Sequence, residues 1–283
     1  MEVFYCRLFL FLKMILTTPG QLSYTPKRII SLVPSQTELL HYLGLEEEII
    51  AITKFCVHPG NWFKNKTRIG GTKALDMERI ISLKPDLIIA NKEENVQEQV
   101  EKLAENFPVW VTDVDDLTAA YRMISDIGLL TKKENEASGL IDLIKIKFDY
   151  IYQISNTNKR ISVAYLIWKN PYMTVGGDTF ISSMLETAGL MNVFSNETRY
   201  PEITLSQLKT INLPTGQAGC ELVFLSSEPY PFKQKDIVEL QKELPGIQIM
   251  LVDGEMFSWY GSRLLESPDY FIKLRSDYQV SGS

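Results

Sequence analysis

Residues 28–55, "RIISLVPSQTELLHYLGLEEEIIAITKF", contain the pattern on which the fold prediction depends. A short apolar run closed by Pro34 predicts a buried strand, and the amphipathic segment after it predicts a helix that ends at Gly44. Ser35 is the predicted N-cap of this helix, and Glu38 completes a capping box. The second apolar run, "EIIAITKF", predicts another strand. Strand, helix and strand in this order form the unit from which parallel sheets are built.

The same alternation continues along most of the chain. Downstream, "MERIISLKP" and "VQEQVEKLAENF" predict helices, and "DLIIAN" and "PVWVTD" predict strands. In the second half, "RISVAYLIW", "CELVFLS" and "IQIMLVD" predict strands. Between these strands, "TFISSMLETAGL", "LSQLKTI" and "KQKDIVELQKEL" predict helices, and "SPDYFIKLRSDY" predicts a helix that closes the chain. The first of these helices starts at Asp178 or Thr179 and ends at Gly189. The rhythm predicts an α/β fold with mainly parallel sheets.

The longest helical pattern, residues 131–155, lies at the middle of the chain. Ala137, Ile141, Ile144, Phe148 and Ile151 recur at intervals of four, three, four and three residues, which gives one apolar stripe. We expect a long helix that joins two similar lobes, with a ligand cleft between them. The predicted divisions are an N-terminal extension of undetermined status (1–26), an N-terminal lobe (27–130), the connecting helix (131–157) and a C-terminal lobe (158–283).

Composition and motifs exclude several classes of function. The 283 residues suffice for two domains, and the net charge of −6 without a basic stripe argues against nucleic-acid binding. Three widely spaced cysteines and two histidines do not form a CxxC pair or a His-rich metal centre. The phosphate-binding GxxxxGK[ST], the dinucleotide-binding GxGxxG and the hydrolase GxSxG patterns are absent. We therefore predict no catalytic residues, no metal ligands and no enzymatic activity.

The apolar N-terminus, "MEVFYCRLFLFLKMILTTPG", is interrupted by Glu2, Arg7 and Lys13. Its longest uninterrupted run is shorter than the roughly 20 residues of a membrane span. A positive n-region and a small-x-small cleavage site are missing, and translation starting at Met14 is an alternative. Export to the periplasm or cell envelope and a cytoplasmic location therefore both stay open.

Aromatic residues follow several predicted strands. In an open α/β sheet, ligands bind beyond the carboxyl ends of the strands, and aromatic rings suit a large, partly planar ligand. The stretch "LVDGEMFSWYGSRLL", residues 251–265, is thus either a ligand wall or an aromatic plug that packs a loop onto the body. The candidate cleft residues are Phe55, Trp62, Trp168, Tyr172, Met173, Arg199, Tyr200, Phe257, Trp259, Tyr260 and Arg263. We expect about half of them to line the cleft and the others to cap the sheets.

The stretches "RIISLVPSQTELLHYLGLEEEIIAITKF", "GGTKALDMERIISLKPDLIIAN" and "PYMTVGGDTFISSMLETAGLMNVF" resemble the Fe/B12 periplasmic-binding family. The resemblance covers roughly residues 27–275 and implies two α/β lobes joined by a rigid helix, with little closure around the ligand. It adds Pro34, Ser35, Gly71 and Thr72 to the expected ligand-binding residues. The B12-binding members are the most similar, although Thr72 and Asn91 stand where such a protein has tryptophans, and "DGEMFSWYGSR" differs from its final loop.

The resemblance implies a substrate-binding protein of an ABC importer. The expected ligand is a bulky metal chelate, a corrinoid first and an iron-siderophore or haem next, with no covalent cofactor. The expected partners are the permease subunits, and we expect a monomer. Glu78 matches a docking glutamate of the first lobe, or it only complements a helix dipole; Glu202 is the carboxylate closest to the second docking position. Arg263 either anchors an acidic ligand group or holds its loop.

A function of another class is also consistent with the sequence. Because fold does not determine function, a cytoplasmic cofactor-handling protein or an enzyme that reuses the same fold is the alternative.

Overall fold

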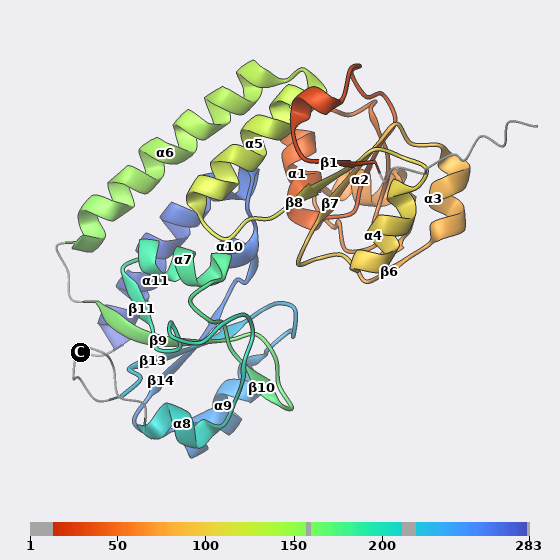
Figure 1. Ribbon diagram of the computed structural model, residues 1–283. Helices are drawn as coiled ribbons and strands as arrows, with labels where there is room; N and C mark the ends of the chain where they lie inside the picture. The colour runs from red at the N-terminus through yellow and green to blue at the C-terminus, as the bar shows by residue number, and fades with distance from the viewer. Residues whose placement is uncertain (1–13, 157–159, 211–218, 282–283) are drawn as a thin grey trace, which may run out of the picture. The chain divides into compact units, whose positions relative to one another are not determined.

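The computed structural model describes residues 14–156, 160–210 and 219–281. The start of the predicted N-terminal extension (1–13), the last residue of the predicted connecting helix (157) and parts of the predicted C-terminal lobe (158–159, 211–218 and 282–283) lie outside the described residues. The chain divides into two compact units (Figure 1). The first contains the residues up to Asp113 and residues 126–134, and the second contains residues 114–125 and those from Asn135 onward.

The first unit is built on a six-stranded sheet in the order β1-β8-β7-β2-β3-β4, and every neighbouring pair is parallel. Its strands are β1 (Ile15–Leu16), β2 (Ile29–Ser31), β3 (Ile49–Ile52), β4 (Thr67–Arg68), β7 (Leu87–Asn91) and β8 (Val109–Thr112). Its helices are α1 (Pro34–Tyr42), α2 (Gly60–Asn65), α3 (Met77–Leu83) and α4 (Gln97–Ala104), and a small antiparallel pair joins β5 (Gly70–Gly71) to β6 (Ala74–Leu75). The predicted parallel α/β arrangement is confirmed.

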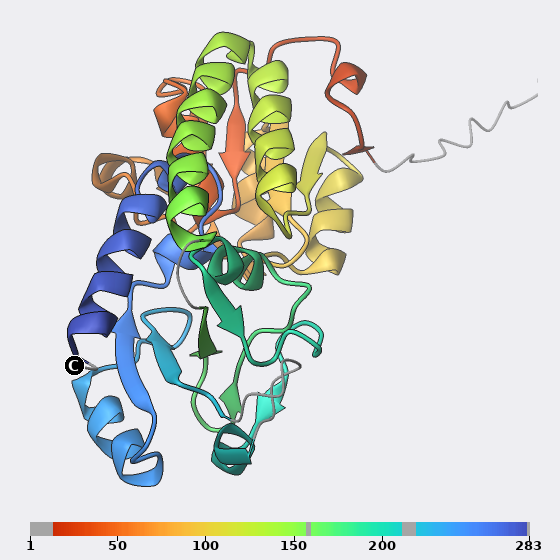
Figure 2. The ribbon, with the colours of Figure 1, turned by 90° about the vertical axis from the view of Figure 1, so that its left-hand side faces the viewer.

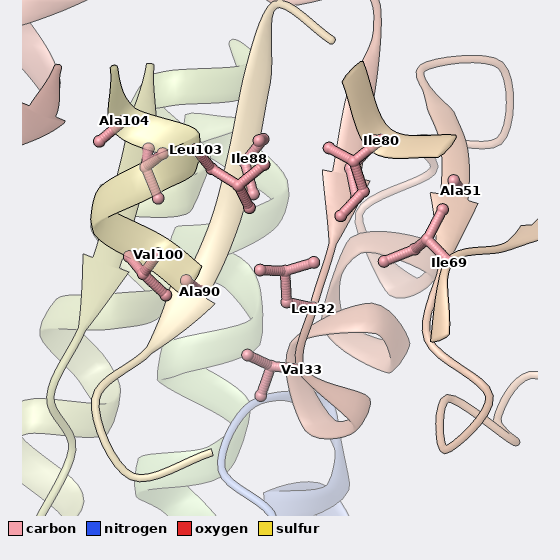
Figure 3. Packing of buried hydrophobic residues seen from close by; sticks show 12 residues of the cluster. Leu32, Val33, Ala51, Ile69, Ile80, Ile88, Ala90, Val100, Leu103 and Ala104 are labelled. Atoms are coloured by element: carbon pink, nitrogen blue, oxygen red, sulfur yellow. The ribbon is translucent and has the colours of Figure 1, made fainter. Parts of the chain in front are cut away.

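Apolar side chains of this sheet pack against α3 and α4. Figure 3 shows Ile88 and Ala90 of β7 turned toward Leu103 and Val100 of α4, with Ile80 of α3 close to β2. All five side chains are buried. The near-continuous apolar runs of β2 and β7 follow from this, because a parallel strand covered on both faces has no solvent side.

The start of α1 differs from the prediction. The N-cap is Val33, without a side-chain cap, and Pro34 occupies the first helical position, so the predicted capping box of Ser35 and Glu38 is wrong. Proline fits this position because its backbone dihedral is already helical and the N–H that it lacks would have no partner there. The predicted end is confirmed, since the helix stops at Tyr42 and Gly44 has a φ of 76°.

Two long helices lie at the middle of the chain. α5 (Leu117–Thr131) begins in the second unit and ends in the first, and α6 (Glu134–Asn156) follows it. The sequence pattern did not predict α5, and the long helix predicted to begin at residue 131 begins at Glu134. Lys132 separates the two helices with a φ of 59°, a left-handed conformation that ends α5 and turns the chain. The apolar stripe of α6 is confirmed at Ala137, Ile144 and Phe148, which are buried.

The second unit has a four-stranded parallel sheet in the order β11-β9-β13-β14 (Figure 2). Its strands are β9 (Ile161–Leu166), β11 (Leu190–Asn192), β13 (Leu222–Ser226) and β14 (Gln248–Val252), and β10 (Tyr172–Met173) pairs antiparallel with β12 (Glu202–Ile203). Its helices after α6 are α7 (Phe180–Thr187), α8 (Leu205–Thr210), α9 (Gln234–Glu243), α10 (Glu255–Ser258) and α11 (Ser267–Ser281).

The last strand of this sheet is an edge strand. "QIMLV" has the apolar sequence of a buried strand, but in β14 Leu251 is exposed and Met250 is half-buried because the strand has a neighbour on one side only. The aromatic stretch that follows forms α10 and a 3-10 turn at Ser262–Leu265. It leads directly into α11, whose Phe271 packs against Phe257 with ring centroids 4.7 Å apart.

Candidate functional site

The carboxyl ends of the parallel strands of the first unit meet along one side of its sheet, which we call the first edge. The segments that leave β2, β3 and β4 there contain five predicted ligand-binding residues. These are Pro34, Ser35, Phe55, Gly71 and Thr72. Their strands are adjacent and parallel, so the structure brings these positions to one side of the sheet, as a site beyond the strand ends requires.

Neutral side chains hold the exits of β2 and β3 together. The Thr37 hydroxyl lies 2.7 Å from Ser31 Oγ and 3.1 Å from the Cys56 sulfur, and Thr53 Oγ1 lies 3.2 Å from the same sulfur. All four side chains are buried. Burial raises the pKa of the Cys56 thiol, against the opposing effect of the threonine hydrogen bonds, so the sulfur stays protonated and neutral.

A second neutral network supports the exits of β7 and β8. Thr112 Oγ1 accepts hydrogen bonds from Gln36 Nε2 at 2.5 Å and Asn91 Nδ2 at 3.2 Å, and it donates to the Ala90 carbonyl. Asn95 Nδ2 donates to the Thr72 carbonyl at 3.1 Å and so fixes the turn that carries Thr72. The Gln36 carbonyl oxygen is buried and has no hydrogen-bond partner among the described residues.

Only some of the residues at the first edge are exposed to solvent. Ser35 and Thr72 are buried, whereas Phe55 is 50% exposed and Lys54 beside it is exposed. Pro34 is half-buried. A ligand that reached this edge would therefore meet Phe55, Lys54 and the proline ring, with the buried hydroxyls beneath them.

Trp62 is not brought to the first edge. Its indole is buried, donates to the Glu46 carboxylate at 2.5 Å and packs edge-on against His41 at 5.1 Å. His41 lies in the last turn of α1, and Glu46 precedes β3, so both are at the opposite end of these elements from the strand exits. Lys66 Nζ lies 5.3 Å from the Trp62 ring. These contacts anchor α2 to the unit.

In the second unit, the carboxyl ends of β9, β13 and β14 define the second edge. Trp168 follows β9, and its ring packs edge-on against Tyr230, which follows β13, with centroids 5.7 Å apart. Tyr230 in turn contacts Phe232 at 4.7 Å. Trp168 is 40% exposed, so this pair presents an aromatic surface to solvent.

Lys169 fastens the Trp168 segment to α9. Its ammonium lies 2.8 Å from the Asp236 carboxylate, which is buried, and 2.7 Å from Glu239. The hydrogen bonds that the Lys169 ammonium donates to Asp236 and then to Glu239 raise the pKa of Lys169. Burial alone would raise the pKa of Asp236, but hydrogen bonds from Lys169 and the Lys233 N–H hold it below the ordinary value. Both groups are therefore charged at neutral pH.

Trp259 is held between two charged groups at the exit of β14. Its Nε1 donates to Glu228 Oε1 at 3.0 Å, and the same oxygen accepts from the Ser258 hydroxyl at 2.5 Å. The Arg263 guanidinium lies 5.2 Å from the Trp259 ring and 3.3 Å from the Glu255 carboxylate. Trp259 is only 6% exposed. In this geometry Arg263 holds the loop.

Two of the predicted aromatics at this exit lie in the interior. Phe257 is fully buried and touches the rings of Tyr165 and Phe224 as well as α11. Tyr260 packs edge-on against Phe180 at 5.6 Å and is also buried. The two rings therefore support the second edge from within the unit.

Four further predicted residues lie on the segments around β10 and β12. Tyr172 and Met173 are half-buried in β10, and the Met173 N–H donates to the Trp168 carbonyl at 3.2 Å. Arg199 is exposed, and its backbone is fixed by bonds to Asp178 and to Gly176. Gly176 is required there because an added Cβ would lie 2.5 Å from the backbone of the facing segment. Tyr200 is half-buried.

Sequence reasoning missed four residues of these edges: Lys54, Lys169, Glu228 and Tyr230. The signal for the last two was available, because "SSEPYPF" follows a predicted strand just as the chosen aromatics do. Lys169 and Glu228 act through partners 67 and 31 positions away in the chain, which no local pattern shows.

Among the residues that the structure describes, no helix is long and apolar enough to cross a membrane. Within the same residues, no three His, Cys, Asp or Glu side chains are grouped so that they could hold a metal ion.

Comparison with known proteins agrees with this architecture. The family model described as periplasmic binding protein matches residues 29–214, so this chain belongs to the periplasmic binding protein family.

Three similar proteins illustrate the range of the family. The chain is 26% identical over 186 residues to a vitamin B12-binding protein of Vibrio campbellii, covering 65% of this chain and 67% of that one. It is 26% identical to an uncharacterized ABC transporter substrate-binding lipoprotein of Bacillus subtilis, covering 66% and 62%. The solved structure of a possible iron-binding (periplasmic solute-binding) protein of Staphylococcus epidermidis superposes with a TM-score of 0.73 at 25% identity, covering 90% and 99%.

Proposed function

We propose that this protein is the substrate-binding component of an ABC importer and binds a bulky metal chelate, either a corrinoid or an iron chelate such as a siderophore complex or haem. The family membership and the names of the similar proteins support the class. The exposed aromatic residues at each edge support the choice of ligand.

The observation that carries the proposal is aromatic exposure at the strand exits. Phe55 and Trp168 are 50% and 40% exposed although each follows a buried strand. Exposed rings at the carboxyl ends of parallel strands are placed where open α/β sheets bind ligands. Covering an aromatic ring with a planar chelate removes apolar surface from water, at about 25 cal/mol per Å2.

The proposed ligand contacts are unequal. Phe55 and Pro34 at the first edge offer exposed or half-exposed surface for contact with a chelate, and so do Trp168 and Tyr230 at the second edge. Tyr172, Met173, Arg199 and Tyr200 border the Trp168 segment and complete the second edge. The other predicted residues are buried or held by contacts within the protein, and they would support the edges without direct ligand contact. These are Ser35, Gly71, Thr72, Phe257, Trp259, Tyr260 and Arg263.

Docking to the permease subunits is proposed for Glu78 and Glu202, which are both exposed. Glu78 lies in the first turn of α3, behind the N-cap Asp76, where its charge also favours the helix. Glu78→Gln should keep chelate affinity within twofold and weaken association with the importer most at low salt, because exposed charges are least screened there. Equal association of the variant and the wild type at every salt concentration would remove Glu78 from the docking surface.

The experiment that tests the proposal is a calorimetric titration with cyanocobalamin, haemin and ferric siderophores. At least one chelate should bind with a dissociation constant of about 1 μM or lower. Trp168→Ala should weaken that binding by about 1–3 kcal/mol. The matched control is Tyr152→Ala, which removes an exposed aromatic ring of α6. Absence of binding for every chelate, or equal losses in the two variants, would contradict the proposal.

A further inference from the structure

The charge of the first unit is distributed unevenly along the chain. Residues 54–75, "KFCVHPGNWFKNKTRIGGTKAL", contain five Lys or Arg and one His but no Asp or Glu, although the whole chain has a net charge of −6. A local excess of one sign raises the concentration of oppositely charged ligands around it. This stretch includes three of the five predicted residues at the first edge: Phe55, Gly71 and Thr72.

Three of these cations bind other groups of the same unit. Lys66 donates to the Glu46 carbonyl and lies 3.5 Å from the Glu46 carboxylate. Arg68 donates to the Phe63 carbonyl and stacks on the Phe63 ring. Lys73 donates to the Glu93 carbonyl. These three side chains are bound to the protein itself, and they stabilise α2 and the β5–β6 turn.

Lys54 differs from them. Its ammonium lies 5.1 Å from the centroid of the Phe55 ring, and within the described part of the chain no carboxylate lies within ion-pair distance of it. The side chain is exposed at the exit of β3. Lys54 is thus a cation beside an exposed aromatic ring at the place where the ligand is proposed to bind.

The backbone under this pair is shaped to hold it. The Lys54 N–H donates to the Gly70 carbonyl at 2.8 Å, which brings the exit of β3 against β5. A Cβ added at Gly71 would lie 3.0 Å from Phe55 Cε2 and 3.1 Å from Lys54 Cε. The absent side chain of Gly71 therefore lets the Phe55 ring and the Lys54 methylene groups lie against the β5 backbone. We call Lys54, Phe55 and Gly71 the platform.

We infer that the platform binds a carboxylate of the ligand, with Lys54 on the charge and Phe55 against the planar part, so the ligand is a carboxylate-bearing iron chelate rather than a corrinoid without net charge. The inference rests on the proposed function and names the class of substrate for the same site. Porphyrin propionates and carboxylate siderophores share this chemistry.

Four chelates and three variants test it. Haemin and ferric citrate bear carboxylates, whereas ferrichrome and cyanocobalamin do not have free ones. Lys54→Met should weaken the binding of at least one carboxylate chelate tenfold or more, because methionine keeps the packing on Gly71 but removes the charge. Lys54→Arg should restore most of the affinity. Lys64→Met, an exposed lysine of the same acid-free stretch, should leave every affinity within twofold.

The outcomes separate the inference from the proposed function. Raising NaCl from 50 to 500 mM should weaken carboxylate binding several-fold in the wild type and less in Lys54→Met, since salt screens the ammonium. Comparison of haemin with ferric citrate then identifies the source of the carboxylate. Binding of only the two chelates without free carboxylates, or equal affinity of Lys54→Met and the wild type for the carboxylate chelates, would overturn the inference alone. Failure of all four chelates to bind would overturn the proposed function.

Discussion

The first and second edges are both carboxyl ends of parallel sheets, but different forces hold them. Hydroxyl, thiol and amide groups join the strand exits at the first edge, and Thr112 alone takes part in three such hydrogen bonds. Ion pairs and aromatic rings do the same at the second edge, where Lys169 meets Asp236 and Trp259 meets Glu228. The same architecture is thus stabilised by neutral groups in one unit and by charged groups in the other.

At each edge the exposed surface differs in polarity from the groups that support it. The network that supports the first edge is neutral, and within the described residues no carboxylate lies at ion-pair distance from Lys54. At the second edge Lys169 and Arg263 are paired with carboxylates, and the Trp168–Tyr230 pair supplies exposed aromatic surface. Neutral hydrogen bonds do not titrate, whereas an ion pair is lost where one partner changes its protonation, which for Asp236 is below about pH 4.

The largest effect is expected from truncation of the aromatic support. Trp259→Ala should lower the free energy of unfolding by about 3–5 kcal/mol, because a buried indole is lost and Glu228 loses a donor. Phe55→Ala at the first edge should change it by about 0.5 kcal/mol or less, since half of that ring is already in water. Urea unfolding of both variants gives the two values, and similar losses would show that the edges are supported alike.

The next effect is expected at the buried ion pair. Asp236→Asn should cost about 3 kcal/mol at pH 7, because it leaves the Lys169 ammonium with Glu239 as its carboxylate partner. The control, Glu239→Gln, removes the exposed partner and should cost less than about 1 kcal/mol. Urea midpoints of the three proteins measure both changes. Equal costs for the two variants would contradict this prediction, because the buried Asp236 would then stabilise the fold no more than the exposed Glu239.

The pH dependence of that cost has a defined sign. Asp236 has a lower pKa in the folded protein than its ordinary 3.8, so its contribution is fully present above about pH 4 and disappears as the pH falls through the folded value. The difference between wild type and Asp236→Asn should therefore be constant from pH 5 to 8 and shrink below pH 4. A difference that stayed constant down to pH 3 would contradict the lowered pKa.

A smaller effect is expected in the neutral network. Thr112→Val keeps the shape but removes the hydroxyl that Gln36 and Asn91 use, at a cost of about 2 kcal/mol. Unlike the loss in Asp236→Asn, this loss should persist at low pH because it involves neutral groups. Unfolding of the variant at pH 7 and pH 3.5 checks the contrast, and a loss that vanished at the lower pH would mean that a carboxyl takes part in the network.

The smallest effect on stability is expected at Gly71. Gly71→Ala meets only the ends of two flexible side chains, so it should cost less than about 1 kcal/mol while displacing Phe55 and Lys54. Gly70→Ala should destabilise the fold more than Gly71→Ala, because Gly70 has a φ of 89° and an added Cβ would lie 2.4 Å from the Ala74 carbonyl oxygen. Thermal unfolding should therefore rank Gly70→Ala as clearly less stable, and the reverse order would refute this account of the platform.

The sequence by itself determined most strands of the two main sheets, several of the helices and some helix ends, although it did not reveal α5. Apolar runs predict β2, β3, β7 and β9 because a strand covered on both faces must be apolar throughout. Gly44 and Gly189 mark helix ends through their left-handed backbone, which is a local property. The rule that ligands bind beyond strand ends then located Phe55 and Trp168 from the pattern alone.

Only the tertiary structure decided which side chains at those ends meet solvent. Phe257 and Trp168 have the same local signature, an aromatic residue just after an apolar strand, yet Phe257 is buried against Tyr165 and α11 while Trp168 is exposed. The pairing of Trp259 with Glu228, and the absence of a carboxylate beside Lys54 among the described residues, likewise depend on residues far away in the chain. Secondary structure follows from neighbours within a few positions, whereas exposure and charge pairing follow from contacts between distant segments, which no local pattern records.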